Sequence, residues 1–206
     1  PTGGEVTVDG VRIDGLRPDE IATRGLALMP GGRGVFPTMT VAENLRLACW
    51  QVRSDRVRSQ EAVTEAIERF PILDERADQM AGNLSGGEQQ QLSLAMAFIT
   101  KPKVLLIDEL SLGLAPTIVG MLCDKVREIN ATGTTVVVVE QSVNVAMQLA
   151  RRAVFLEKGA VRFEGPTGAL LDRPDILRSV FIGGAAADPG LRDVVGERRR
   201  APAALQ

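Results

Sequence analysis

The chain has 206 residues, of which 45% are hydrophobic and 24% are charged, and its formal net charge is −2. This composition is ordinary for a globular protein with one substantial core, and the charge gives no indication of a nucleic-acid partner. Histidine is absent, and the two cysteines, Cys49 and Cys123, lie far apart. Zinc fingers and His-dependent catalysis are therefore not expected. Both cysteines are expected to be buried in a reducing compartment.

The N-terminal residues carry no signal-peptide pattern. The apolar runs have the length of strands, far short of the roughly 20 residues that cross a bilayer. We therefore expect a cytoplasmic protein whose membrane association, if any, comes through a partner. The abrupt start on Pro1-Thr2-Gly3-Gly4 also suggests that an upstream segment is missing.

Residues 1–39 predict a hairpin, a short helix, a strand and a loop. Alternating valines on both sides of Asp9-Gly10 indicate the antiparallel hairpin. The helix is expected from Pro18 to Thr23, and the strand from Leu26 to Met29. The strand leads into a glycine-rich loop that begins at Pro30.

Residues 40–83 have no strand signal and predict a helical subdomain. Thr40 and Glu43 have the spacing of a capping box, which starts a helix from Val41 to about Trp50. A second helix is expected from Ser54 to Phe70, where Pro71 ends it.

Residues 84–165 alternate between helix and strand patterns. Continuous apolar runs at Val104–Ile107 and Thr134–Val139 predict strands buried on both faces. Further strands are expected at 154–156 and 161–163, and helices after Gly87, from about 116 to 130 and from 143 to 150. Strand, helix and strand in succession predict an α/β fold whose mostly parallel sheet has helices on both sides. Short helices are expected within residues 166–182 (166–171 and 174–180), and residues 183–206 read as a disordered tail.

The run Leu84-Ser85-Gly86-Gly87-Glu88-Gln89-Gln90-Gln91 opens a helix with two glycines. Glycine lets the backbone approach a ligand closely, and a helix start carries roughly +0.5 charge that suits a phosphate. Ser85 adds a hydroxyl. A plain capped turn would explain Ser-Gly-Gly alone, but the full run is much rarer.

The second motif is the apolar strand Val104–Ile107 followed by Asp108 and Glu109. Ligands bind at the carboxyl ends of parallel strands. Asp108 can hold Mg²⁺ through water there, and Glu109 can polarise an attacking water. Acidic residues that merely end a strand in solvent are the alternative explanation.

In this order and spacing, the two motifs resemble the signature motif and the Walker B motif of ATP-binding-cassette (ABC) ATPases. The segments 30–37, 40–45, 111–116 and 139–141 are similar to the branched-chain amino acid importer type, and the resemblance covers about residues 3 to 182. It implies a P-loop NTPase-like three-layer fold in which residues 1–182 form the ATPase domain. Its parts are residues 1–39 with the hairpin and Q-loop region, residues 40–83 with the helical subdomain, residues 84–165 with the core sheet, and residues 166–182 with the C-terminal helices.

The resemblance also implies the site. Two ATPase subunits would dimerise head to tail, as a homodimer or a heterodimer, with ATP and Mg²⁺ sandwiched between them. Nucleotide binding falls on Ser85, Gly86, Gly87, Glu88 and Gly31, with the first four facing ATP held by the partner. Asp108 would support Mg²⁺, Glu109 would be the catalytic base, and Gln141 occupies the place of the family's switch histidine. Transmembrane permease subunits would bind the 30–36 loop region, and a solute-binding protein would act through them.

The sequence departs from the family pattern in four places. No G-x-x-x-x-G-K-[ST] phosphate loop is present, and the only lysines are Lys101, Lys103, Lys125 and Lys158. The fold is therefore expected to be incomplete, without the first strands and phosphate loop, and with part of its apolar sheet surface exposed. Gly31 stands where the family has Gln or Glu, Gln141 where it has His, and Leu110 where it has Pro.

Three functions follow as hypotheses. The first is the energising subunit of a branched-chain amino acid importer, with negligible ATP hydrolysis by these 206 residues alone. The second is a non-catalytic partner that offers only its signature motif to an intact ATPase. The third is a related ATPase for urea uptake or lipopolysaccharide export, which residues 111–116 favour less.

Overall fold

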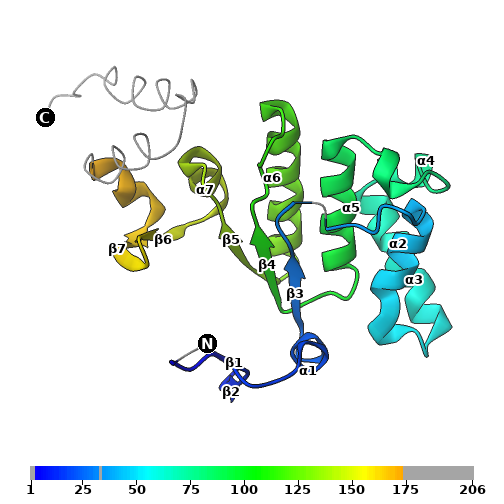
Figure 1. Cartoon of the computed structure of the whole chain (residues 1–206), viewed down its shortest axis with the longest axis horizontal. Helices are drawn as coiled ribbons and strands as arrows, with labels where there is room; N and C mark the ends of the chain where they lie inside the picture. The colour runs from blue at the N-terminus through cyan, green and yellow to red at the C-terminus, as the bar shows by residue number, and fades with distance from the viewer. Residues whose placement is uncertain (1–2, 33, 174–206) are drawn as a thin grey trace, which may run out of the picture. The chain divides into compact units, whose positions relative to one another are not determined.

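The computed structural model describes residues 3–32 and 34–173 (Figure 1). The described residues form two compact units, which divide between Val139 and Glu140. The first unit contains β1 (Thr7–Val8), β2 (Val11–Arg12), α1 (Pro18–Thr23), β3 (Leu26–Met29), α2 (Val41–Ala48), a 3-10 turn (Cys49–Val52), α3 (Arg56–Arg69), α4 (Ile72–Glu75), a second 3-10 turn (Ala81–Asn83), α5 (Gly86–Phe98), β4 (Val104–Asp108), α6 (Pro116–Ala131) and β5 (Thr135–Val139). The second contains α7 (Val143–Leu149), β6 (Arg152–Glu157), β7 (Ala160–Pro166) and a 3-10 helix (Thr167–Asp172).

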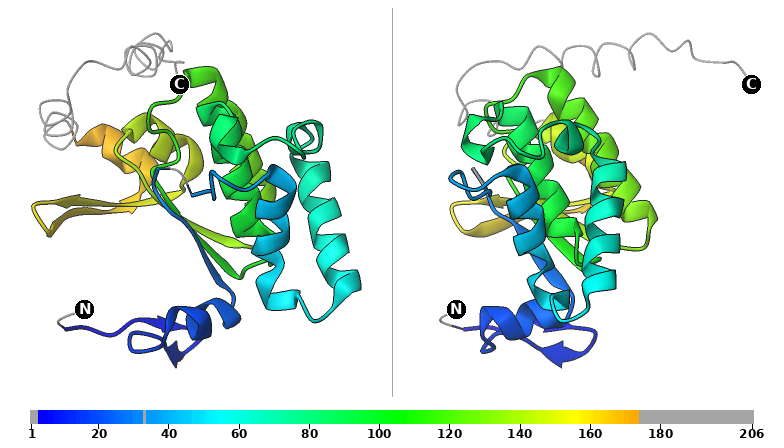
Figure 2. Two further views of the ribbon diagram at one scale, coloured as in Figure 1. Left: turned by 45° about the vertical axis from the view of Figure 1, so that its right-hand side comes forward. Right: turned by 90° about the vertical axis from the view of Figure 1, so that its right-hand side faces the viewer.

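The first unit is built on a parallel sheet with the strand order β3-β4-β5. Met29 pairs with Ile107, and Asp108 pairs with Val139, so the three strands end together at one edge. Helices α5 and α6 pack against each other and against this sheet, as Figure 2 shows. The predicted α/β fold with a parallel sheet is confirmed, and the carboxyl ends of its strands provide the edge where ligands bind in such sheets.

One face of the sheet is covered and the other is open. Met29, Leu105 and Ile107 are buried, whereas Leu28, Val137 and Val139 are 59%, 47% and 61% exposed. The prediction of strands buried on both faces is therefore wrong for these described residues, whereas the expectation that part of the apolar sheet surface is exposed holds for them. The physical reason is that α5 and α6 pack on the face of Leu105 and Ile107, since alternate strand residues point to opposite faces.

Helices α2 to α4 form the predicted helical subdomain beside α5 (Figure 1). The capping box at α2 is present, because the Thr40 side chain accepts from the Glu43 amide at 3.2 Å and Glu43 accepts from the Thr40 amide at 2.8 Å. An isolated antiparallel bridge between Thr40 and Met80 closes the subdomain. The first helix ends at Ala48 and continues as a 3-10 turn rather than as α-helix to Trp50.

The second unit contains a two-stranded antiparallel sheet of β6 and β7. The strands expected at 154–156 and 161–163 form within β6 and β7. They pair with each other because the tight turn at Gly159, which has φ of 78°, returns the chain directly onto the preceding strand. The expected helix at 166–171 forms as the 3-10 helix Thr167–Asp172. The predicted helix at 174–180 and tail at 183–206 lie outside the described residues.

Both cysteines are buried, as expected. Burial raises the pKa of the Cys49 thiol, whose sulfur lies 3.5 Å from the Leu45 carbonyl oxygen. Within the described ranges, no helix is long and apolar enough to cross a membrane.

Candidate functional site

The start of α5 forms a turn, Leu84–Glu88, which we call the glycine turn; Ser85 and Gly86 are exposed and Leu84 is buried. Ser85 is the N-cap residue, and its hydroxyl oxygen accepts a hydrogen bond from the Glu88 amide at 3.3 Å. The Glu88 carboxylate returns the contact by accepting from the Ser85 amide at 2.8 Å. This is a second capping box. The Ser85 hydroxyl uses its oxygen as an acceptor in this box, so its proton can still be donated to another group.

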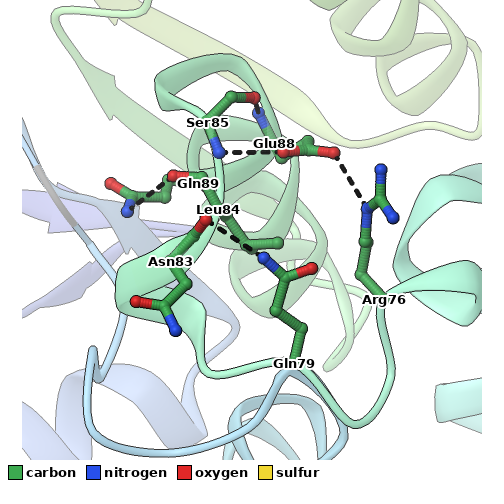
Figure 3. Close-up of polar contacts among 7 residues, drawn as sticks. All are labelled: Arg76, Gln79, Asn83, Leu84, Ser85, Glu88 and Gln89. Atoms are coloured by element: carbon green, nitrogen blue, oxygen red, sulfur yellow. Dashed lines mark hydrogen bonds and ion pairs between the residues drawn. The ribbon is translucent and has the colours of Figure 1, made fainter.

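Arg76 reaches the glycine turn from the segment that follows α4, as Figure 3 shows. Its Nε donates to Glu88 Oε1 at 3.3 Å, while Glu88 Oε2 accepts from Ser85. The Ser85 amide, and with it the neighbouring Arg76, holds the pKa of Glu88 below its usual value. Glu88 therefore carries a full negative charge at neutral pH, directly at the start of the helix.

Two glutamine side chains fix the segment that enters the glycine turn (Figure 3). Gln89, which is buried, donates from Nε2 to the carbonyls of Ala81 and Leu84 at 3.0 and 3.3 Å. Gln79 donates to the Asn83 carbonyl at 3.0 Å. Backbone carbonyls in a loop need such partners, and the Ala81 carbonyl also accepts from the Leu84 amide at 3.3 Å. The two side-chain amides therefore help to set the path by which the chain reaches Ser85.

Gly86 and Gly87 occupy the first helical positions of α5, where backbone amides have no partner inside the helix. Among the described residues, no hydrogen bond uses either amide. A Cβ on Gly87 would lie 2.8 Å from Ile118 Cγ2, and a Cβ on Gly86 would lie 3.4 Å from Leu114 Cδ2. The glycine turn therefore packs against the loop before α6 and against α6 itself. Two amides and a hydroxyl remain open to an anion.

Asp108 lies at the carboxyl end of β4, exposed and beside Gly31. A Cβ on Gly31 would lie 3.3 Å from Asp108 Oδ2. The structure thus brings two predicted site residues together, because β3 and β4 end at the same edge. No hydrogen bond or ion pair of the described residues joins the glycine turn directly to Asp108.

Glu109 has an unusual backbone conformation, with φ of 55°. A non-glycine residue in the left-handed region costs about 1–2 kcal/mol, and such outliers cluster at functional sites. The Glu109 amide donates to the Val139 carbonyl at 2.9 Å, which fixes this conformation at the end of the sheet. Leu110, which follows, is fully buried and anchors the chain after the two acids.

Gln141 is exposed and is the second residue of the second unit, just before α7. Ser142 caps α7 by accepting from the Val145 amide at 3.4 Å. The role of Gln141 stays a prediction from the family resemblance.

The loop that follows β3 is held by a residue for which the sequence analysis predicted no role. Asn44 is fully buried; its Oδ1 accepts from the Phe36 amide at 2.8 Å, and its Nδ2 donates to the Phe36 carbonyl at 3.0 Å. Gly34 packs so closely on Ser93 of α5 that a Cβ could not fit. An Asn at the fourth position of a capped helix gave only a weak signal for this contact, which joins the loop to the helical subdomain.

The acidic side chains at the sheet edge suit a cation bound by few protein ligands rather than a metal ion fully coordinated by the protein. In the described parts of the chain, no group of three or more acidic or cysteine residues could hold a metal ion. Mg²⁺ usually takes one or two carboxylates and keeps water or phosphate oxygens as its other ligands. Asp108, exposed at the sheet edge, fits that pattern.

Comparisons with known proteins show the family and the fold. A family model described as ABC transporter matches residues 1–111. The high-affinity branched-chain amino acid transport ATP-binding protein BraG of Pseudomonas aeruginosa is 39% identical over 181 residues, covering 88% of this chain and 76% of that protein. The probable branched-chain amino acid transport ATP-binding protein LivF of Archaeoglobus fulgidus is 33% identical over 170 residues, covering 82% and 71%. Among solved structures, a dimeric ATP-binding cassette in a post-hydrolysis state bound to ADP and Pi aligns with a TM-score of 0.70 and 25% identity, covering 81% of this chain and 75% of that one.

Proposed function

Since the chain belongs to the ABC transporter family, we propose that it is the ATP-binding subunit of an importer for branched-chain amino acids. The choice of solute rests on the two named relatives, because both are described as serving branched-chain amino acid transport. Urea uptake and lipopolysaccharide export are the less favoured alternatives for the same ATPase chemistry.

The observation that carries the proposal is the glycine turn. Two unpartnered amides, an available hydroxyl proton and the positive end of α5 converge on an exposed surface, which is the chemistry that binds a phosphate. In this proposal Ser85, Gly86 and Gly87 bind the γ-phosphate of ATP held by the opposite subunit. Glu88 contributes by fixing the Ser85 backbone.

The acidic pair at the end of β4 supplies the second half of the site. Asp108 holds Mg²⁺ through water, and Glu109 orients and deprotonates the attacking water. Gln141 takes the place of the switch histidine. Bound MgATP supplies the free energy of phosphoryl transfer; the protein contributes positioning and charge.

The partners follow from the family. The dimeric cassette with ADP and Pi supports a dimer of ATP-binding subunits. Permease subunits would contact the loop from Pro30 to Phe36, which Asn44 fastens to the helical subdomain. The protein would then lie on the cytoplasmic face of the plasma membrane, and a solute-binding protein would deliver the amino acid to the permease.

Transport of labelled leucine into vesicles tests this function. The protein, produced together with the permease subunits and the solute-binding protein of a branched-chain amino acid importer, should drive ATP-dependent leucine uptake. Glu109→Gln should abolish uptake and leave assembly intact. Uptake of urea in place of leucine, or no dependence on Glu109, would contradict the proposal.

A second candidate function is a non-catalytic partner that offers only the glycine turn. Gly31 favours it, because a glycine beside Asp108 has no side chain that could bind Mg²⁺ there. The 206 residues also contain no G-x-x-x-x-G-K-[ST] sequence. Equilibrium binding of ATP to the full-length protein separates the two candidates. Micromolar binding would exclude the non-catalytic role, whereas binding only after addition of a second ATPase subunit would support it.

A further inference from the structure

Arg76 makes a contact to the glycine turn that folding alone does not explain. The Arg76 and Glu88 side chains are 45% and 19% exposed, and their closest atoms are 3.3 Å apart. Ion pairs that water reaches contribute little to stability. The pair therefore adds little to the fold, yet it joins the segment after α4 to the residue that caps α5 (Figure 3).

Glu88 presents a problem for an anion site. Its carboxylate favours the helix start and holds the Ser85 amide. The same negative charge follows immediately after the open amides of Gly86 and Gly87, where it opposes binding of a phosphate. Arg76 supplies a positive charge on the oxygen of Glu88 that does not contact Ser85.

We propose that Arg76 is a positioning residue of the glycine turn, which holds the Glu88 carboxylate on the Ser85 amide and cancels its charge toward a bound triphosphate. Arg76 touches no reacting atom, so it acts on binding of the nucleotide rather than on its cleavage. The inference rests on the proposed function, in which this turn contacts ATP.

Steady-state ATP turnover by the assembled full-length protein tests the proposal. Arg76→Ala should raise the KM for ATP about three- to tenfold, the size of a charge effect near a helix terminus, with kcat changed less than twofold. Arg76→Lys keeps the charge and should restore a KM within twofold of wild type. Arg162→Ala breaks an ion pair of similar geometry in β7, with 3.2 Å to Glu157, and should change neither constant.

A double-mutant cycle with Glu88→Gln identifies the partner. Gln keeps an acceptor for the Ser85 amide but has no charge for Arg76 to hold, so only the direct attraction between Arg76 and the phosphate remains. Arg76→Ala should therefore raise KM less in that background than in wild type. Equal effects of Arg76→Ala in both backgrounds would overturn the assignment.

Amide hydrogen exchange gives a readout that needs no nucleotide. Loss of Arg76 should speed exchange of the Ser85 amide at least threefold, because its acceptor Glu88 becomes free to turn away, while amides in the middle of α5 exchange as before. Unchanged Ser85 exchange would overturn the holding role. Absence of ATP turnover by the wild type would refute the proposed function and the charge-cancelling role together, whereas normal turnover with an unchanged KM in Arg76→Ala would refute this inference alone.

Discussion

The Ser85 side chain has two separable properties at the residue scale. Its oxygen caps the Glu88 amide, and its proton is the donor that the proposed function assigns to a phosphate. The first property can be tested by stability and the second by binding.

Ser85→Ala should lower the free energy of unfolding by about 1 kcal/mol, the usual cost of removing an N-cap. Urea denaturation followed by circular dichroism measures the change. Ser85→Asp, which provides an equally good cap, should unfold within about 0.5 kcal/mol of wild type. A loss as large for Asp as for Ala would show that capping is not what the hydroxyl contributes.

Substitution of the two glycines of the turn should have different effects on stability. Gly87→Ala places a Cβ 2.8 Å from Ile118 Cγ2 and should destabilise the protein by about 1–3 kcal/mol, the cost of overpacking. Gly86→Ala makes only ordinary contact with Leu114 and should be neutral within about 0.5 kcal/mol, since alanine favours a helix. Thermal unfolding compares the pair, and Ile118→Ala should rescue Gly87→Ala. Equal effects of the two alanines would contradict the packing.

Glu88 makes stability depend on pH in a defined direction. Its folded-state pKa lies below the ordinary value of 4.5, so its contribution is complete above that value and is lost as the pH falls through the lower folded pKa. The difference in unfolding free energy between wild type and Glu88→Gln should therefore shrink between pH 6 and pH 3. Glu43, whose pKa is lowered by the Thr40 amide, remains in both proteins, so the difference isolates Glu88. A difference that grows on acidification would contradict the sign.

Local sequence patterns predicted those features of the fold that depend on contacts between residues close together in the chain. The capping box of Thr40 and Glu43 is readable from spacing alone, and so are the bounds of α1 and β3. The left-handed Glu109 and the contact between Gly87 and Ile118 were not predicted, because both depend on how separate parts of the chain pack. The roles of the predicted site residues remain proposals.

At the scale of elements, the connection between β3 and α2 depends on one buried amide. Asn44 satisfies both the amide and the carbonyl of Phe36 and also donates to the Thr40 carbonyl at 2.9 Å. The side chain therefore ties the loop from the sheet edge to the first turn of the helical subdomain.

Asn44→Leu should destabilise the protein by about 1–3 kcal/mol, because it leaves buried backbone groups of the loop without partners. Chemical denaturation measures the loss. Gln60→Leu on the exposed side of α3 is the matched control and should cost less than about 0.5 kcal/mol. If the two substitutions cost the same, the loop is not held through Asn44.

Strand burial was the prediction that failed at this scale. A run of apolar residues cannot distinguish a strand covered on both faces from one covered on a single face, because β-branched residues suit either position. β5 carries Val137 and Val139 on the exposed side. The antiparallel pairing of β6 with β7 agrees with the two short strands expected at 154–156 and 161–163.

At the scale of the whole molecule, the first unit carries both the residues at the sheet edge and the glycine turn. Asp108 and Gly31 lie together at the sheet edge, and the glycine turn lies against the loop and helix that follow Glu109. In the proposed function these groups bind different nucleotides, one held by the subunit itself and one held by its partner. This separation is the central claim of the account.

ATP-dependent association of the full-length protein, measured by sedimentation velocity, tests this claim most directly. Glu109→Gln, which blocks hydrolysis, provides the background, and the protein should sediment as a dimer with MgATP and as a monomer without it. Adding Ser85→Asp keeps the helix cap but places a negative charge where the phosphate of the partner's nucleotide would bind, so the MgATP-dependent dimer should be lost. A dimer that forms equally well with Ser85→Asp would contradict the claim that the glycine turn binds ATP across the subunit boundary.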